Sequence, residues 1–282
     1  MALSLDFAFE GFRSIRERPK LILFWGAVSL AGSLLALSLL IGVSGPSLAQ
    51  MMALAAASGT TPDPQAMVGP LEGALPGMAL FAAVNMVTNA ILATAAARSA
   101  LTETDDRFGF LGLGWAEARM VVIHGFMGVM TLVLLMIGSV VGSIGGQAGA
   151  VTGMVAAAGV IVSLRLRLSL NGPQSFHRQV IDVFGSFALT RQEVWRLALG
   201  YVMALLLAAA VWFLCRQVIE TTVTLAFGEI AAPDITSLRA YLTPTNAVIV
   251  VFGGAVISPL IAAIVYGAPA AAYRALKPSG PA

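Results

Sequence analysis

Histidine and cysteine, two side chains that commonly transfer protons or bind metals, are rare in this sequence. His124 and His177 are the only histidines, and Cys215 is the only cysteine. His124 stands in a long stretch that contains no Asp, Glu, Lys or Arg. An ionisable residue inside a membrane segment is a candidate functional residue. His124 lies only one turn from the end of that stretch, and this position favours instead a neutral, hydrogen-bonded packing role.

A second polar group follows from the spacing of three residues. Asn85, Thr88 and Asn89 are three and four positions apart, so in a helix they share one face. Two interpretations are open. In the first, which is the more ordinary in helical bundles, they hydrogen-bond neighbouring helices, and each bond contributes about 0.6 kcal/mol. In the second, they line a polar cavity for a solute, together with His124 and a helix kink at Pro259.

No familiar catalytic or metal-binding motif is present. The sequence lacks His-Glu-x-x-His, Gly-x-Ser-x-Gly, a phosphate-binding loop and paired cysteines. No Asp or Glu lies deep inside a predicted membrane segment, which argues against a proton relay. We therefore predict that the protein is not an enzyme and uses no cofactor or metal.

The segments that must position these residues are strongly apolar. Hydrophobic residues make up 58% of the 282-residue chain and charged residues 11%, against roughly 45–50% and 25% in soluble domains. About 20 consecutive apolar residues span a bilayer as a helix. We predict an all-α, polytopic membrane protein, a six-helix transmembrane bundle that forms a single domain over 1–282. The predicted spans lie near 21–43, 76–97, 120–142, 149–166, 196–217 and 246–270.

The distribution of basic residues predicts how these spans are oriented. Of the 16 Lys and Arg residues, only Arg216 and Arg239 fall on one side of the predicted membrane. All the others fall on the opposite side. Because cytoplasmic loops are the ones enriched in Lys and Arg, both termini are expected in the cytoplasm.

Three segments beside the spans are predicted to form amphipathic helices at the cytoplasmic membrane surface: 4–18, 105–118 and 174–188. Thr190 and Glu193 are predicted to form a capping box for the helix that follows. A basic residue near the surface of an anionic membrane contributes about 1 kcal/mol of attraction. Five basic residues near the third segment are therefore candidate lipid-headgroup contacts: Arg165, Arg167, Arg178, Arg191 and Arg196.

Small residues predict a tight hairpin between the third and fourth spans. Two Gly-x-x-x-Gly pairs flank the turn, Gly138 with Gly142 and Gly149 with Gly153. Such pairs let helix backbones approach closely in lipid. We interpret these glycines as packing residues, with a gating hinge as the alternative.

Two further patterns concern the connections. The first outer loop, 44–75, is rich in proline, and we predict a short surface helix over 47–57 followed by a turn-rich stretch over 58–70. A Glu close to an Arg precedes the first, third and fifth spans, at 15–18, 115–119 and 191–196. This fits either three repeated units or the capping and orientation of each inward-starting helix.

The stretch Arg165–Tyr201 resembles a known family. The carrying residues are Arg-Leu-Arg-Leu-Ser-Leu at 165–170, Pro173, Ser-Phe-Ala-Leu-Thr-Arg at 186–191 and Trp-Arg-Leu at 195–197. They are similar to the bacterial glycerophosphoryl diester phosphodiesterase membrane-domain family and related six-span inner-membrane proteins. In some members this domain is joined to a soluble phosphodiesterase. The resemblance implies the membrane part alone, in a bacterial inner (plasma) membrane, and carries over no catalytic residue.

Two functions fit these patterns. The first is a non-enzymatic, multi-pass inner-membrane protein that contacts membrane lipids or other membrane proteins, in envelope or lipid homeostasis. The alternative is a transporter of a small or lipid-like solute. The net charge of +2 gives no reason to expect a nucleic-acid partner.

Overall fold

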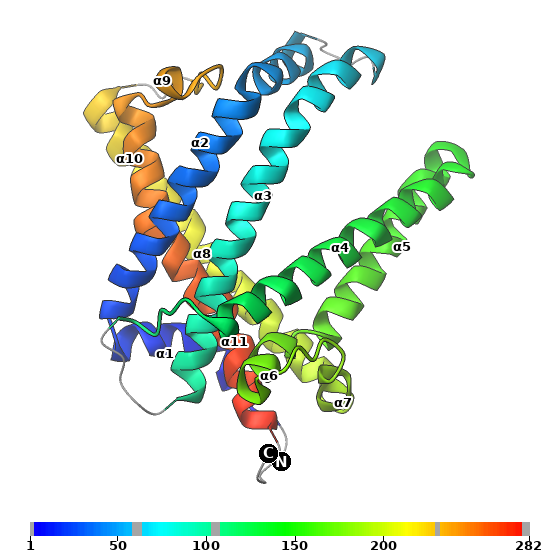
Figure 1. Ribbon diagram of the computed structural model, residues 1–282, viewed down its shortest axis with the longest axis vertical. Helices are drawn as coiled ribbons and strands as arrows, with labels where there is room; N and C mark the ends of the chain where they lie inside the picture. The colour runs from blue at the N-terminus through cyan, green and yellow to red at the C-terminus, as the bar shows by residue number, and fades with distance from the viewer. Residues whose placement is uncertain (1–2, 58–63, 103–107, 229–231, 278–282) are drawn as a thin grey trace. The chain divides into compact units, whose positions relative to one another are not determined.

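Every regular element in the structure is a helix (Figure 1). The computed structural model describes residues 3–57, 64–102, 108–228 and 232–277, and none of these residues forms a strand. Six helical segments in this described part are long and apolar enough to cross a membrane. The predicted fold class, an all-α multi-pass membrane protein with six spanning helices, is confirmed.

Contacts within the chain define two units. Unit 1 comprises residues 1–21, 90–208 and 262–282, and unit 2 comprises residues 22–89 and 209–261. The long helices α3 (Pro64–Leu101) and α8 (Val194–Phe227) contribute residues to both units.

In unit 2, helix α2 (Lys20–Ala57) continues without a break past Pro46. The prediction of a separate surface helix over 47–57 is therefore wrong. Proline is tolerated inside membrane helices because neighbouring groups can satisfy the backbone atoms that it frees. Helix α3 begins at Pro64, so the predicted turn-rich stretch is helical from residue 64 onward, and residues 58–63 lie outside the described part of the chain.

A serine of α2 is inserted into the hydrogen-bond ladder of α3. The Ser44 hydroxyl donates to the carbonyl of Gly73 at 2.8 Å and accepts from the N–H of Gly77 at 3.0 Å. These two backbone groups would bond each other in a regular helix. Pro76 lies between them, and a proline ring disturbs the preceding turn. Ser44 thus satisfies both groups and joins α2 to α3 through one buried side chain.

The last span of the chain is interrupted by a π-helical segment. Helix α10 (Pro244–Phe252) is followed by η2 (Gly253–Ile257), which is π-helical, and then by α11 (Ser258–Leu276). The irregularity thus precedes Pro259, which is itself fully buried. Pro259 has no N–H to offer the carbonyl of Ala255, four residues earlier. This carbonyl lies against Gly26 of α2, where a Cβ atom would clash with it.

In unit 1, the N-terminal segment packs against two long helices. It forms a 3-10 turn, η1 (Leu5–Phe9), and then α1 (Glu10–Glu17). The ring of Phe7 meets Tyr201 of α8 edge-on, with ring centroids 5.7 Å apart. A Cβ atom at Gly11 would lie 2.5 Å from the Cα atom of Ile264 in α11. This close backbone approach needs glycine.

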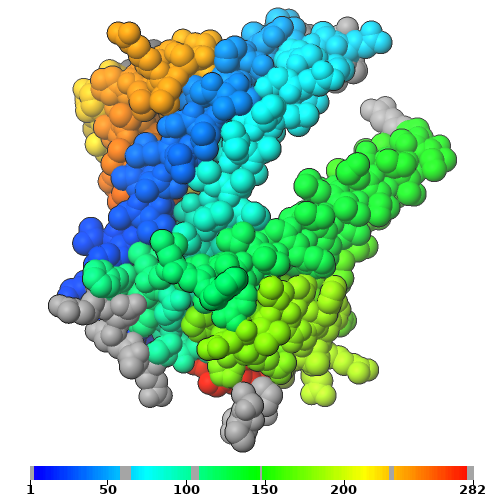
Figure 2. Space-filling model, viewed as in Figure 1, coloured from blue at the N-terminus to red at the C-terminus, as the bar shows by residue number. Residues whose placement is uncertain are grey.

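Helices α4 (Trp115–Ser143) and α5 (Gly146–Arg167) form an antiparallel hairpin, which is a continuous green ridge in Figure 2. The outer side chains of this hairpin are large, apolar and exposed, including Val129, Leu132, Met136 and Ile144. In water, so large an apolar surface would be unfavourable. The hairpin is therefore built to face lipid.

The two predicted surface helices beside this hairpin are wrong in their extent. In place of one helix over 174–188, the structure has α6 (Asn171–Arg178) and α7 (Ser186–Thr190). Gln179 adopts a left-handed conformation with φ of 58° and ends α6. The carboxylate of Asp182 then accepts hydrogen bonds from the side chain of Gln174 and the N–H of Gly185. These bonds favour a turn over a continued helix.

Residues 108–114 of the predicted helix over 105–118 form an irregular loop, and α4 begins only at Trp115. Residues 105–107 lie outside the described part of the chain. Gly109 and Phe110 both have positive φ, 68° and 62°, which a helix does not allow. Arg98 of α3 holds this loop by donating to the carbonyl of Phe110.

Candidate functional site

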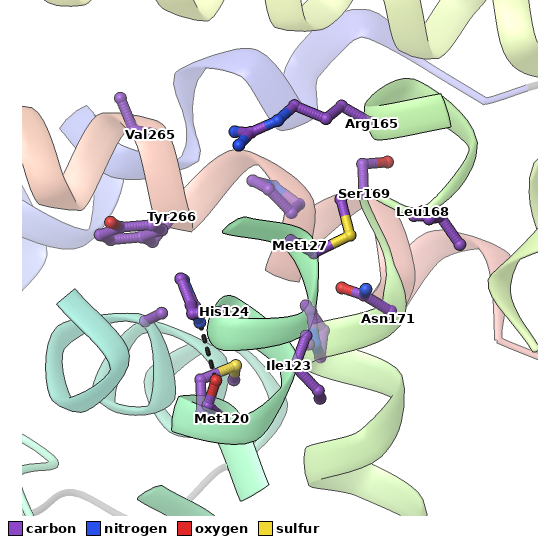
Figure 3. A pocket seen from close by; sticks show the side chains of 14 residues that line it. Met120, Ile123, His124, Met127, Arg165, Leu168, Ser169, Asn171, Val265 and Tyr266 are labelled. Carbon is purple, nitrogen blue, oxygen red and sulfur yellow. Dashed lines mark hydrogen bonds between the residues drawn. The ribbon is translucent and has the colours of Figure 1, made fainter. Parts of the chain in front are cut away.

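A pocket of about 230 Å³ lies in unit 1, where the start of α4, the α5–α6 junction and α11 meet (Figure 3). Its apolar walls come from Ala93 of α3, Met120, Ile123 and Met127 of α4, and Leu168 and Val265. Its polar side chains come from His124, Arg165, Ser169, Asn171 and Tyr266. The pocket therefore combines an apolar wall with a small number of hydrogen-bonding groups, as ligand sites commonly do.

The α5–α6 junction is held in place by buried side chains of the same segment. Leu168 and Leu170 are fully buried and anchor the turn that separates the two helices. The hydroxyls of Ser186 and Thr190 both donate to the carbonyl of Arg167, at 3.0 and 3.2 Å. They thus satisfy a carbonyl at the end of α5 that has no partner within the helix.

This use of Thr190 differs from the predicted capping box. Its hydroxyl bonds back to the end of α5, and the carboxylate of Glu193 instead pairs with Arg196 at 3.1 Å. Helix α8 begins one residue later, at Val194. The pairing of Glu193 with Arg196 withdraws the carboxylate from the N–H groups that a capping box would use.

His124 is fixed on one wall of the pocket. Its Nδ1 atom lies 2.9 Å from the carbonyl of Met120, drawn as the dashed line in Figure 3. A carbonyl only accepts, so Nδ1 carries the proton and Nε2 is the nitrogen left for other partners. The ring of Tyr266 lies edge-on to the imidazole at a centroid distance of 6.2 Å. His124 is thus packed against α11 as well as hydrogen-bonded to its own helix.

Asn171 and Arg165 supply the hydrogen-bond donors on the opposite wall. Asn171 is 6% exposed, and its Nδ2 atom has no hydrogen-bond partner among the described residues. Arg165 donates through one terminal nitrogen to the hydroxyl of Thr131 at 3.0 Å. Figure 3 shows both side chains entering the pocket from the α5–α6 side, across from Tyr266.

The charge of the pocket is positive. No Asp or Glu lines it. Arg165 makes no ion pair among the described residues, whereas Arg98, Arg178, Arg196 and Arg274 each pair with a carboxylate. An arginine beside an apolar wall and without a counter-ion attracts an anion more strongly than a paired arginine does.

The residues of the predicted polar cluster are divided between the two units. His124 belongs to unit 1, whereas Asn85, Thr88, Asn89 and Pro259 belong to unit 2 and do not line the pocket. The Asn85 amide donates to the carbonyl of Phe81 and the Thr88 hydroxyl to that of Val84, both within α3. Helices in lipid favour such local bonds when no partner helix supplies one.

The candidate headgroup arginines fall into different environments. Arg165 lines the pocket, and the Arg167 carbonyl receives the two hydroxyls described above. Arg178 pairs with Asp182 at 3.3 Å, and Arg196 pairs with Glu193. Arg191 is exposed in the turn before α8. Only Arg165 among the five faces the pocket.

The four glycines singled out by spacing meet across the α4–α5 hairpin. A Cβ atom at Gly142 would lie 2.7 Å from the carbonyl oxygen of Gly149, and one at Gly138 would lie 2.8 Å from that of Gly153. Real Cβ atoms do not approach so closely. The hairpin therefore depends on the absence of side chains at these positions.

Two ion pairs in which the glutamate is buried lie outside what sequence patterns could signal. Glu117 is 5% exposed and bonds Arg98 at 2.7 Å, and Glu10 bonds Arg274 at 2.9 Å. Each pair joins residues far apart in the sequence. Glu17, in contrast, pairs with Arg13 on the same exposed helix face. Each glutamate of the three similar motifs thus pairs with an arginine, which is close in sequence for Glu17 and Glu193 and distant for Glu117.

No group of three His, Cys, Asp or Glu residues in the described ranges is arranged to hold a metal ion. Comparisons with protein-family models, with curated proteins and with solved structures found no match. The resemblance of Arg165–Tyr201 to the glycerophosphoryl diester phosphodiesterase membrane-domain family stays a prediction.

Proposed function

We propose that this chain is a non-enzymatic protein of a bacterial inner membrane that binds a membrane lipid in the pocket between α4, the α5–α6 junction and α11. The observation that carries the proposal is the pairing of an apolar wall with an arginine that has no counter-ion among the described residues. A lipid presents the same pairing, an acyl chain beside a polar headgroup. Both termini lie in the cytoplasm in this proposal, as the arginine distribution predicts.

The surroundings of the pocket support a lipid more than a soluble ligand. Helices α4 and α5, which carry one side of the pocket, expose large apolar side chains along their length. A lipid could reach the pocket along this surface without entering water. Arg165 stands near the end of α5, where basic residues usually meet headgroups.

Photocrosslinking tests this proposal. A photoreactive amino acid at Met127, in the pocket, is compared with one at Val140, on the exposed apolar surface of the same helix. Both variants are irradiated in native membranes, and lipid adducts are measured by mass spectrometry of the purified protein. We expect one lipid class to be enriched at Met127 and bulk composition at Val140. The same lipid profile at both positions would contradict a binding site.

A second candidate function, transport of a small or lipid-like solute, is favoured by one observation. The π-helical segment Gly253–Ile257 precedes the buried Pro259, and such segments are frequent at functional sites. Purified protein in liposomes, screened for solute flux, tests it. Transport along the face of Asn85 and Asn89 predicts that Asn85→Leu and Asn89→Leu abolish flux. Unchanged flux in both variants would exclude that path.

A further inference from the structure

We propose that the headgroup bound in this pocket is anionic, and that Arg165 and Asn171 select it over a zwitterionic headgroup. This inference rests on the proposed function, because it assumes that a lipid occupies the pocket. The ligand class is a phospholipid whose phosphate carries the only headgroup charge, such as phosphatidylglycerol. Its phosphate oxygens are the groups to which the two side chains would donate.

Arg165 is held ready for an anion. The hydroxyl of Thr131 accepts from Arg165 at 3.0 Å and itself donates to the carbonyl of Met127 at 2.7 Å. This chain fixes the position of the guanidinium through one of its five N–H donors. No carboxylate among the described residues pairs with the others, so they can hold two phosphate oxygens in the planar arrangement that arginine favours.

Asn171 supplies the second donor. A buried amide without a partner is unfavourable, and native proteins normally satisfy such groups. Its Nδ2 atom is enclosed and unpaired among the described residues, and the side chain lies in the pocket wall beside Ser169. A phosphate oxygen that reached the Nδ2 atom from the pocket would give this amide the partner that it lacks. The hydroxyl of Ser169 already accepts from Tyr201 at 2.9 Å, which holds this residue in place.

The lining also disfavours a positive group. A zwitterionic headgroup would bring an ammonium into a pocket that holds an arginine and no Asp or Glu. The two like charges would repel each other. The volume of about 230 Å³ suits a headgroup, and Ile123, Met127 and Val265 offer apolar contact to the first methylenes of an acyl chain.

Native mass spectrometry of the purified full chain tests the selection. The protein is mixed in detergent with equal amounts of phosphatidylglycerol and phosphatidylethanolamine, and the bound fraction of each is measured. We expect phosphatidylglycerol to be favoured about tenfold. The free energy of one hydrogen bond to a charged group corresponds to about a tenfold or larger change in affinity. Arg165→Gln should remove the preference, and Arg165→Lys should retain part of it, because a lysine keeps the charge but loses the planar pair of donors. The matched control, Arg119→Gln on α4, should leave the preference unchanged, because Arg119 does not line the pocket.

The outcomes separate the two proposals. If the bound fraction of each lipid on the wild-type protein is no higher than that of the detergent, the proposed function fails. If both lipids bind the wild-type protein equally well, lipid binding stands and the inference fails. The inference also fails if Arg165→Gln unfolds at the wild-type temperature and keeps the preference for phosphatidylglycerol. Inorganic phosphate is added in a third arm. Complete displacement of the lipid by phosphate at equal concentration would assign the site to a free anion and overturn the lipid headgroup as its ligand.

Discussion

Replacing Arg98 by glutamine should cost far more stability than replacing an exposed arginine in a pair of the same type. Arg98 and Glu117 bond at 2.7 Å, with side chains 23% and 7% exposed. Removing one partner of a buried pair costs about 3–5 kcal/mol, because the other charge stays buried. Arg98 also donates to the carbonyl of Phe110 and lies over the ring of Phe176. Since Arg98 is partly exposed, we expect a loss near the lower end, about 3 kcal/mol.

The control is the pair of Arg13 and Glu17 at 2.9 Å, whose side chains are 61% and 50% exposed. The hydrogen bond from Arg13 lowers the pKa of the Glu17 carboxyl. Water screens it nonetheless, and an exposed pair contributes about 0.2–1 kcal/mol at most.

Reversible unfolding in mixed micelles, followed by circular dichroism, measures both losses as free energies of unfolding. The double variant Arg98→Met, Glu117→Leu should recover most of the stability lost in Arg98→Gln, because no unpaired charge remains buried. A loss for Arg98→Gln within 0.5 kcal/mol of that for Arg13→Gln, on the order of an exposed pair, would refute the reasoning from burial.

Two further predictions use the same unfolding measurement. Ser44→Ala leaves the carbonyl of Gly73 and the N–H of Gly77 without their shared partner. We therefore expect the free energy of unfolding to fall by about 2 kcal/mol. A fall smaller than the error of the titration would contradict the role of Ser44 as a partner of both groups. Gly142→Leu forces a side chain against the carbonyl of Gly149 and should cost about 1–3 kcal/mol. Gly159→Ala, in open space on the same hairpin, should instead gain about 0.5–1 kcal/mol; equal effects of the two glycine substitutions would count against close packing.

The spanning helices could be predicted from the sequence because the cost of placing a charge in lipid is large and depends on local composition alone. The uncharged stretch 120–164 shows this, since it is too long for one span and the Gly-rich segment at its middle marks a turn between two helices. The extents of the helices were less predictable. The predicted outer loop 44–75 contained Pro46 and ended just before Pro76, but a buried serine of α2 satisfies the backbone of α3 around Pro76.

The candidate site was predictable in part. His124 stood out as an ionisable residue in an apolar stretch, and Arg165 belonged to a basic cluster. Nothing local distinguished Asn171 or Tyr266, because their roles follow from the α5–α6 turn and from the packing of α11 on α4. The ion pair of Arg98 with Glu117 was hidden for the same reason. A pair separated by 19 positions leaves no periodic signal in the sequence.

In the proposed topology, six helices cross the membrane. The arginine-bearing segments lie on the cytoplasmic side, and the Arg165 pocket lies there with them. Cysteine labelling tests this most directly, in a Cys215→Ser background with a membrane-impermeant maleimide. Ala232→Cys should be labelled in intact spheroplasts, and Arg191→Cys should be labelled only after the membrane is opened. Labelling of both positions under the same condition would contradict the proposed topology.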